Sequence, residues 1–253
     1  MYDATNGENW FNTWDLEQPI DTWFGVMLNE EGCVICIDLD GIPNCTVPFT
    51  TDTIGNNLVG FIPEQLEELE SLEALYLSHN ELTSVIPRSI SNLTQLTNLW
   101  LNDNNLTGDF PVGVILLDSL QRLVLHDNQL TGSLPPEIAN LPNIAYFIAS
   151  DNQLTGCFPD SYLDLCGINI DFSNNPSLSW GGNFDIFCEG SSSQIGASCD
   201  DQNEETLLDV IQIDCTCKGQ RDIQALTFST PCRSFETGEE QCLPFQVLSL
   251  IHI

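Results

Sequence analysis

The motif Asn104-Asn-Leu-Thr-Gly-Asp-Phe-Pro111 decides the fold, because the chain repeats it with a period of 24 residues. The other copies are Asn80-Glu-Leu-Thr-Ser-Val-Ile-Pro87, Asn128-Gln-Leu-Thr-Gly-Ser-Leu-Pro135 and Asn152-Gln-Leu-Thr-Gly-Cys-Phe-Pro159. The marker prolines keep the same spacing at Pro63, Pro87, Pro111, Pro135 and Pro159. A strict period of this length predicts a solenoid, in which each turn of chain packs only against its neighbours.

Each repeat also contains a short run with apolar residues at alternate positions. The runs are Leu75-Tyr-Leu77, Leu99-Trp-Leu101, Leu123-Val-Leu125 and Phe147-Ile-Ala149. A period of two predicts one brief strand per repeat, with the first and third side chains turned toward the core. Stacked repeats would join these strands into a parallel sheet, and the apolar stretch that follows each proline would return the chain along the outer face.

An asparagine follows each strand from Leu75-Tyr-Leu77 onward at a fixed distance, and Asn56 stands one period before Asn80, after the insertion. The column comprises Asn56, Asn80, Asn104, Asn128, Asn152 and Asn175. A side-chain amide can donate and accept hydrogen bonds at once, so each asparagine can satisfy backbone groups of its own turn and of the next. We therefore expect a buried structural ladder.

The consensus L-x-L-x-x-N-x-L-T-G-x-x-P resembles the plant-type leucine-rich repeats of receptor-like kinases, receptor-like proteins and polygalacturonase-inhibiting proteins. The resemblance covers residues 1–180. It implies an α/β-type, right-handed, curved solenoid with a concave parallel β-sheet, which is extracellular, serves recognition and has no catalysis of its own.

The resemblance also divides the chain into three parts. Residues 1–33, with Trp10 among their aromatic side chains, resemble the amino-terminal cap of the family. Residues 34–178 are expected to form the solenoid, with an insertion near 42–53 that is either a contact element or a surface loop. Residues 179–253 are rich in cysteine and predict a disulfide-bonded cap or a small β-rich module, which weakly resembles the ends of algal and diatom repeat proteins.

Eleven cysteines with poor metal-site spacing favour an oxidising compartment, and so an extracellular or cell-surface location by the secretory pathway. Cys157 and Cys166 lie within one repeat and are candidates for a disulfide. The odd number leaves one thiol that is free or bonded outside the segment, possible partners including another copy of the chain. Three sequons, at Asn44, Asn92 and Asn105, predict N-linked glycans.

The charge balance excludes several classes of partner. The chain has 37 acidic and 5 basic residues. Nucleic acids and anionic membranes need basic patches, so neither is expected as a partner. The balance favours cationic ligands, divalent ions or a solubilising role. The chain has no run of eighteen apolar residues, so we expect no membrane span in this segment.

Two columns of residues on the concave face are candidates for contact. Tyr76, Trp100, Val124 and Ile148 occupy the middle of successive strands, and should form an outward apolar stripe that binds a partner or stiffens the sheet. Just after the strands come the carboxylates of Asp103, Asp127 and Asp151. Carboxylates at this spacing could hold calcium, or could be solvated and hydrogen-bonded to neighbouring loops; no other cofactor is expected.

We find no catalytic constellation in the sequence and predict that the chain is not an enzyme. Two functions fit the remaining features. The first is an extracellular recognition module that binds a peptide, glycan or protein partner on its concave face. The second is a glycosylated structural protein of a cell surface or extracellular filament, which would assemble with copies of itself through its solenoid and caps.

Overall fold

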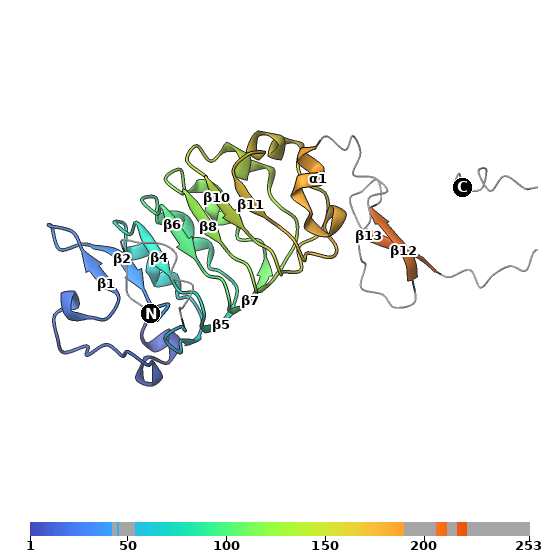
Figure 1. The fold of residues 1–253 in the computed structure, drawn as a ribbon. Coiled ribbons are helices and arrows are strands. Elements are labelled where there is room, and N and C mark those ends of the chain that lie inside the picture. The colour runs from blue at the N-terminus through green and yellow to red at the C-terminus, as the bar shows by residue number, and fades with distance from the viewer. Residues whose placement is uncertain (42–44, 46–53, 190–205, 212–216, 222–253) are drawn as a thin grey trace, which may run out of the picture.

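A computed structural model describes residues 1–41, 45, 54–189, 206–211 and 217–221 of the chain. The described residues up to 189 wind into a solenoid whose strands lie side by side along its length (Figure 1). The Asn44 sequon, most of the 42–53 insertion and much of the cysteine-rich segment after 189 lie outside the described residues. Within the described part of the chain, no helix has the length and apolar character needed to cross a membrane.

The main sheet has seven strands in the order β1-β2-β4-β6-β8-β10-β11. They are β1 (Val26–Leu28), β2 (Val34–Asp38), β4 (Ala74–Tyr76), β6 (Asn98–Trp100), β8 (Arg122–Val124), β10 (Tyr146–Ile148) and β11 (Asn169–Asp171). All neighbours from β2 onward are parallel, whereas β1 pairs antiparallel with β2 at the amino-terminal edge. The register aligns Leu75, Leu99, Leu123 and Phe147, so the predicted parallel sheet of a solenoid is confirmed.

A second sheet, which we did not predict, is formed by residues that follow Asn56, Asn80, Asn104 and Asn128. Its strands are β3 (Val59–Gly60), β5 (Glu81–Ser84), β7 (Asn105–Asp109) and β9 (Gln129–Thr131), in that order. The alternation that produces it is short: Leu106 is buried whereas Asn105 is exposed. The motif Asn-x-Leu-Thr therefore encodes a strand as well as a bend. A separate antiparallel pair, β12 (Thr206–Ile211) and β13 (Cys217–Arg221), lies farther along the chain.

The return segments are 3₁₀ helices. They are η4 (Glu64–Glu68), η5 (Arg88–Asn92), η6 (Val112–Leu116), η7 (Pro136–Asn140) and η8 (Asp160–Leu165). Each begins directly after a marker proline, whose φ lies between −75° and −60°, so the ring presets the direction in which the chain turns. Further short 3₁₀ helices are η1 (Asp3–Thr5), η2 (Gly7–Asn9), η3 (Ile20–Thr22) and η9 (Ser179–Gly182), and α1 (Phe184–Cys188) is the α-helix of the described residues.

The core is one continuous stack of leucines that is closed by aromatic side chains at both ends. Leu77, Leu101 and Leu125 are completely buried in consecutive repeats. At the amino-terminal end, Trp10 and Trp14 lie edge to face with their ring centroids 5.0 Å apart. At the other end, a cluster of phenylalanines covers the core. The ring centroids of its contacting pairs are at most 5.6 Å apart, and its members are Phe158, Phe172, Phe184 and Phe187. Such ends keep the stack from exposing its last apolar layer.

The asparagine side chains connect each turn with the next. The Nδ2 atom of Asn104 donates to the carbonyl oxygens of Leu77, Leu101 and Asn102, at distances between 2.9 and 3.1 Å. Its Oδ1 atom accepts a hydrogen bond from the backbone N–H of Leu82 at 3.0 Å. Asn80, Asn128, Asn152 and Asn175 make equivalent bonds. The amide thus satisfies backbone groups that the strands leave unpaired.

The number of residues between the first two parallel strands shows how long the insertion is. Cys36 pairs with Ala74, which is 38 residues later, whereas Ala74 pairs with Asn98 after 24 residues. A disulfide joins Cys36 to Cys45 within this longer turn.

The predicted disulfide between Cys157 and Cys166 is wrong. Cys166 is bonded to Cys188, so it closes the end of η8 onto α1, and Cys157 is disulfide-bonded as well. The reason is the turn at the carboxyl end, which brings α1 against the last repeat and places Cys188 beside Cys166.

Candidate ligand-binding face

The outward side chains of β4, β6, β8 and β10 form one continuous surface, which we call the sheet face. Cross-strand pairing aligns Tyr76 with Trp100, Trp100 with Val124 and Val124 with Ile148. The sequence therefore predicted the alignment of this column correctly. It is the column that we expected to be an exposed apolar stripe.

The exposure of that column differs from the expectation. Tyr76, Val124 and Ile148 have only 6%, 3% and 8% of their surface exposed, and Trp100 alone remains half-buried. One reason is contact along the column, because the rings of Tyr76 and Trp100 lie edge to face with centroids 5.6 Å apart. Another is that Cys36 and Cys45 pack with Tyr76 in a small apolar cluster at the amino-terminal end of the face.

Burial also changes the acidity of Tyr76. Removal of its phenol from water, which is the largest cause, and the carboxylates of Asp38 and Asp40 together raise its pKa to about 12, although the guanidinium of Arg122 acts in the opposite direction. The hydroxyl group therefore stays protonated at physiological pH, so Tyr76 contributes a neutral hydrogen-bonding group rather than a charge.

A neighbouring column supplies accessible side chains that our sequence analysis missed. Asn98, Arg122 and Tyr146 align across β6, β8 and β10, and all three are half-buried. The Nη1 atom of Arg122 donates to Oδ1 of Asn98 at 3.2 Å, which holds the guanidinium on the face. The signal was present in the sequence, because each of these residues stands two positions before a member of the stripe and so shares its outward direction.

The polar row beside the sheet face lies where the strands end. His79, Asp103, Asp127 and Asp151 all have left-handed backbone conformations, with φ between 53° and 56°. The structure brings Asp103 and Asp127 together with His126, whereas Oδ1 of Asp151 accepts a hydrogen bond from Asn174 at 2.8 Å. Of the three aspartates considered for calcium, two therefore share a cluster with a histidine and the third faces the following repeat.

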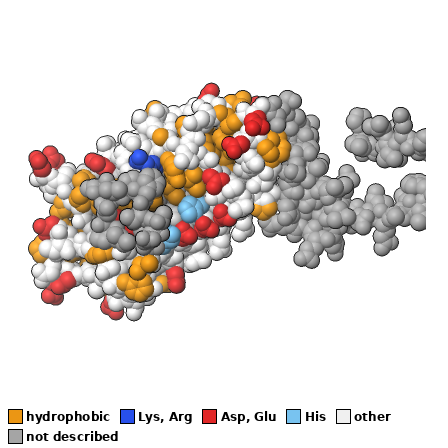
Figure 2. All heavy atoms as spheres, viewed as in Figure 1, with side chains coloured by type: hydrophobic (Ala, Val, Ile, Leu, Met, Phe, Trp, Pro, Cys, Tyr) orange, Lys and Arg blue, Asp and Glu red, His pale blue; other side chains and the backbone are white. Residues whose placement is uncertain are grey.

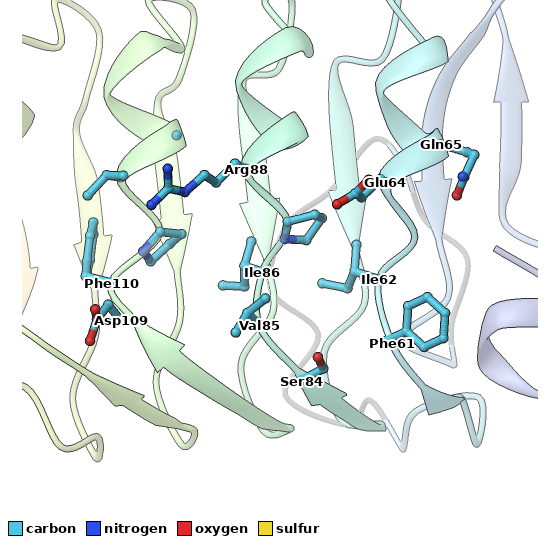
Figure 3. A pocket seen from close by; sticks show the side chains of 14 residues that line it. Phe61, Ile62, Glu64, Gln65, Ser84, Val85, Ile86, Arg88, Asp109 and Phe110 are labelled. Carbon is cyan, nitrogen blue, oxygen red and sulfur yellow. The ribbon is translucent and has the colours of Figure 1, made fainter.

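A groove lies away from the sheet face, between the second sheet and the 3₁₀ helices (Figure 3). Its volume is about 800 Å³. Its wall includes the apolar residues Phe61, Val85 and Phe110 and the charged residues Arg88 and Asp109. Phe61 and Val85 expose about half of their surface there. Of the residues singled out from the sequence, the marker prolines Pro87 and Pro111 line this groove, whereas none of the candidate binding residues does.

The remaining candidate positions lie on the surface. Asn92 and Asn105 are both exposed, as attachment of a glycan requires, and Nδ2 of Asn92 donates to Glu67 at 2.6 Å. Cys33 is exposed and carries a free thiol.

Comparisons with known proteins agree with this architecture. Two family profiles described as leucine-rich repeat match residues 54–106 and 119–141. The BIR2 ectodomain of Arabidopsis thaliana is 25% identical with a TM-score of 0.52, and the match covers 70% of this chain and 82% of that one. The BIR3–SERK2 complex of the same plant is 26% identical with a TM-score of 0.53, covering 72% and 87%.

A plant ice-binding protein is also similar, at 28% identity and a TM-score of 0.56. The match covers 70% of this chain and 51% of that protein, so the chain spans about half of its length. The comparison with curated protein sequences found no match.

Proposed function

We propose, because the repeats are plant-type leucine-rich repeats, that this chain is an extracellular recognition module which binds an extended peptide or protein segment on its sheet face without catalysis. The observation that carries the proposal is the group formed by Trp100, Arg122 and Tyr146. They come from consecutive strands, remain half-buried and stand on a rigid sheet. Tryptophan, tyrosine and arginine are the residue types that dominate binding energy at protein interfaces.

The surroundings of this group favour a ligand with positive charge. Asp103, Asp127 and Asp151 follow one edge of the face, and the chain as a whole has 37 acidic against 5 basic residues. Complementary charge speeds encounter and selects partners more than it adds affinity. Arg122 supplies a cationic point within this acidic field, which can hold a carbonyl or carboxylate group of the ligand.

Three further observations support the location and the mode of action. The disulfides Cys36–Cys45 and Cys166–Cys188 fit an oxidising compartment. One of the similar structures is a complex between two proteins, BIR3 and SERK2. Within the described residues, neither His79 nor His126 is hydrogen-bonded to a hydroxyl or thiol group that it could activate as a nucleophile, since both face Asp103.

Substitution of Trp100 by alanine tests the proposal. Peptides selected from a displayed random library against the folded chain, and glycans from an array, are measured by titration against the wild type and the variant. We expect selected peptides to be rich in lysine and arginine, and Trp100→Ala to weaken their binding by about tenfold or more, as for other interface anchors.

Val85→Ala is the control, because Val85 is an exposed apolar residue that lies in the groove away from the sheet face. It should leave the affinity unchanged. Equal affinity of wild type and Trp100→Ala, with both variants folded, would rule out the sheet face as the binding surface. Selection of glycans alone would change the class of ligand.

A second function, self-assembly as a structural protein, is favoured by one observation, the exposed free thiol of Cys33. It can be separated from recognition by the size of the native material. We expect light scattering and electron microscopy to show a monomer, with calcium and with a chelator, because the acidic surfaces of two copies repel each other. Ordered polymers that are lost in Cys33→Ser would establish a structural role instead.

A further inference from the structure

The polar row beside the sheet face contains a group of two histidines and two aspartates whose capacity to bind a metal the proposed function does not use. We propose that Asp103, His126 and Asp127 bind one divalent transition-metal ion of the zinc type, and that His79, which lies beside this group against Asp103, moves in as a fourth ligand. This inference does not depend on recognition of a peptide. Figure 2 shows the two described histidines, in pale blue, beside acidic side chains on one face of the molecule.

The distances within the group suit such an ion. One ligand atom each from Asp103, His126 and Asp127 lies within 4.8 Å of the other two. Oδ2 of Asp103 is 4.0 Å from Nδ1 of His126. Nδ1 of His79 is 3.4 Å from the same oxygen, but His79 is outside the mutually close group, so its ring must move toward His126 and Asp127 to join the site. Zinc lies about 2.0–2.1 Å from nitrogen and oxygen ligands, so the ligands of a tetrahedral site are about 3.3 Å apart.

One pair must open to admit the ion. Nδ1 of His126 is 2.7 Å from Oδ2 of Asp127, a hydrogen bond that a metal would replace. The required movement is about 0.6 Å, taking the same zinc geometry. Because 29% to 52% of the side-chain surface of Asp103, His126 and Asp127 is exposed, rotation within existing rotamers can supply this movement, and the ion has a path from solvent.

The repeat fixes the relative positions of these ligands. The backbone N–H of Asp103 donates to the carbonyl of His126 at 3.1 Å, which joins the two turns directly. A buried polar chain then orients the central carboxylate: Ser78 donates to Asn102 at 2.7 Å, and Nδ2 of Asn102 donates to Oδ2 of Asp103 at 2.7 Å. Ser78 and Asn102 are 1% and 5% exposed, so this support is rigid. Buried partners of this kind hold the ligands of metal sites in place.

The composition of the group determines which metal it would take. The chain has three histidines among 253 residues, and two of them face the same carboxylate oxygen. Two imidazoles and two carboxylates suit zinc and other borderline divalent ions, whereas calcium prefers six to eight oxygen ligands. Asp151, which would supply another oxygen, is hydrogen-bonded to Asn174 instead. The two carboxylates also balance the charge of one divalent ion.

Titration of zinc chloride into the full chain, measured by calorimetry near neutral pH, tests the site. We expect one ion to bind per chain, and His126→Gln to weaken binding by about tenfold or more. His79→Gln should also weaken it. Cobalt provides a second readout, because His126→Gln should reduce the visible absorption of a bound four-coordinate ion.

Two controls separate this site from other sources of binding. Asp151→Asn removes a carboxylate from the same row outside the group, and should leave zinc affinity unchanged. Cys33→Ser removes the free thiol, and should also have no effect. The proposal is overturned if zinc fails to saturate, if His126→Gln binds as tightly as the wild type, or if calcium displaces zinc at equal concentration. His126 is surface-accessible, and an unchanged melting curve will show that the variant is folded.

Discussion

Replacement of Asn80 by alanine is expected to lower the free energy of unfolding by about 3–5 kcal/mol. The Oδ1 atom of Asn80 accepts hydrogen bonds from the backbone N–H groups of Asn56 and Leu58, both at 2.9 Å. Its Nδ2 atom donates to the carbonyls of Leu39, Leu77 and Ser78 between 2.9 and 3.1 Å. Each buried group left without a partner costs about 1–3 kcal/mol, and partial relaxation reduces the sum.

The matched control is Glu81→Ala, at the next position. Glu81 is exposed in β5, so its removal should change stability by no more than about 0.5 kcal/mol. Denaturant unfolding of the oxidised proteins, followed by circular dichroism, measures both. Asn80→Asp adds a finer test, because a carboxylate keeps the acceptors but has no hydrogen to donate; it should destabilise as well. Equal stability of wild type and Asn80→Ala would contradict the role of the ladder.

The same physics explains why so much of the fold could be predicted. Every feature that the 24-residue period imposes appears in several copies, so the leucines, the asparagines and the marker prolines each confirm one another in the sequence. Our alignment of Leu75, Leu99 and Leu123 across one sheet needed only the spacing and the alternation of a strand. Repetition thus shows which residues far apart in the chain lie next to one another, whereas the sequence of a globular protein without repeats does not.

Features that depend on contact between non-equivalent residues could not be predicted in this way. The low exposure of Tyr76 reflects, besides its packing with the equivalent Trp100, its packing with the Cys36–Cys45 disulfide, which the repeat does not specify. The pairing of Cys166 with Cys188 likewise depends on how α1 returns against the last repeat. Cysteine spacing alone does not define connectivity.

In the candidate site too, the positions that the repeat specifies could be predicted, whereas contacts between other residues could not. The register placed Trp100 on the sheet face, yet we overlooked Arg122 and Tyr146 because we followed only the middle position of each strand. The cluster around Asp103 could not be predicted from the sequence, because His79 and His126 are 47 residues apart (126 − 79). They approach one carboxylate only through the stacking of turns.

Replacement of Leu101 by alanine should destabilise the chain by about 2–5 kcal/mol through a cavity in the core. Leu101 is fully buried and lies between Leu77 and Leu125 in the stack. The cost depends on how well the surroundings collapse into the cavity. Backbone hydrogen bonds hold the turns on both sides, from Leu77 to the carbonyl of Trp100 and from Leu101 to that of Val124. Collapse is therefore restricted, and we expect a value in the upper half of the range.

Leu116→Ala is the control of identical chemistry, because Leu116 in η6 exposes 62% of its surface. Its removal should shift the melting temperature little, whereas Leu101→Ala should lower it by several degrees. A melting curve for Leu101→Ala that matches the wild type would mean that this leucine does not face the core. Because the alternation that buries Leu101 also turns Trp100 outward, that result would remove the basis for the sheet face as well.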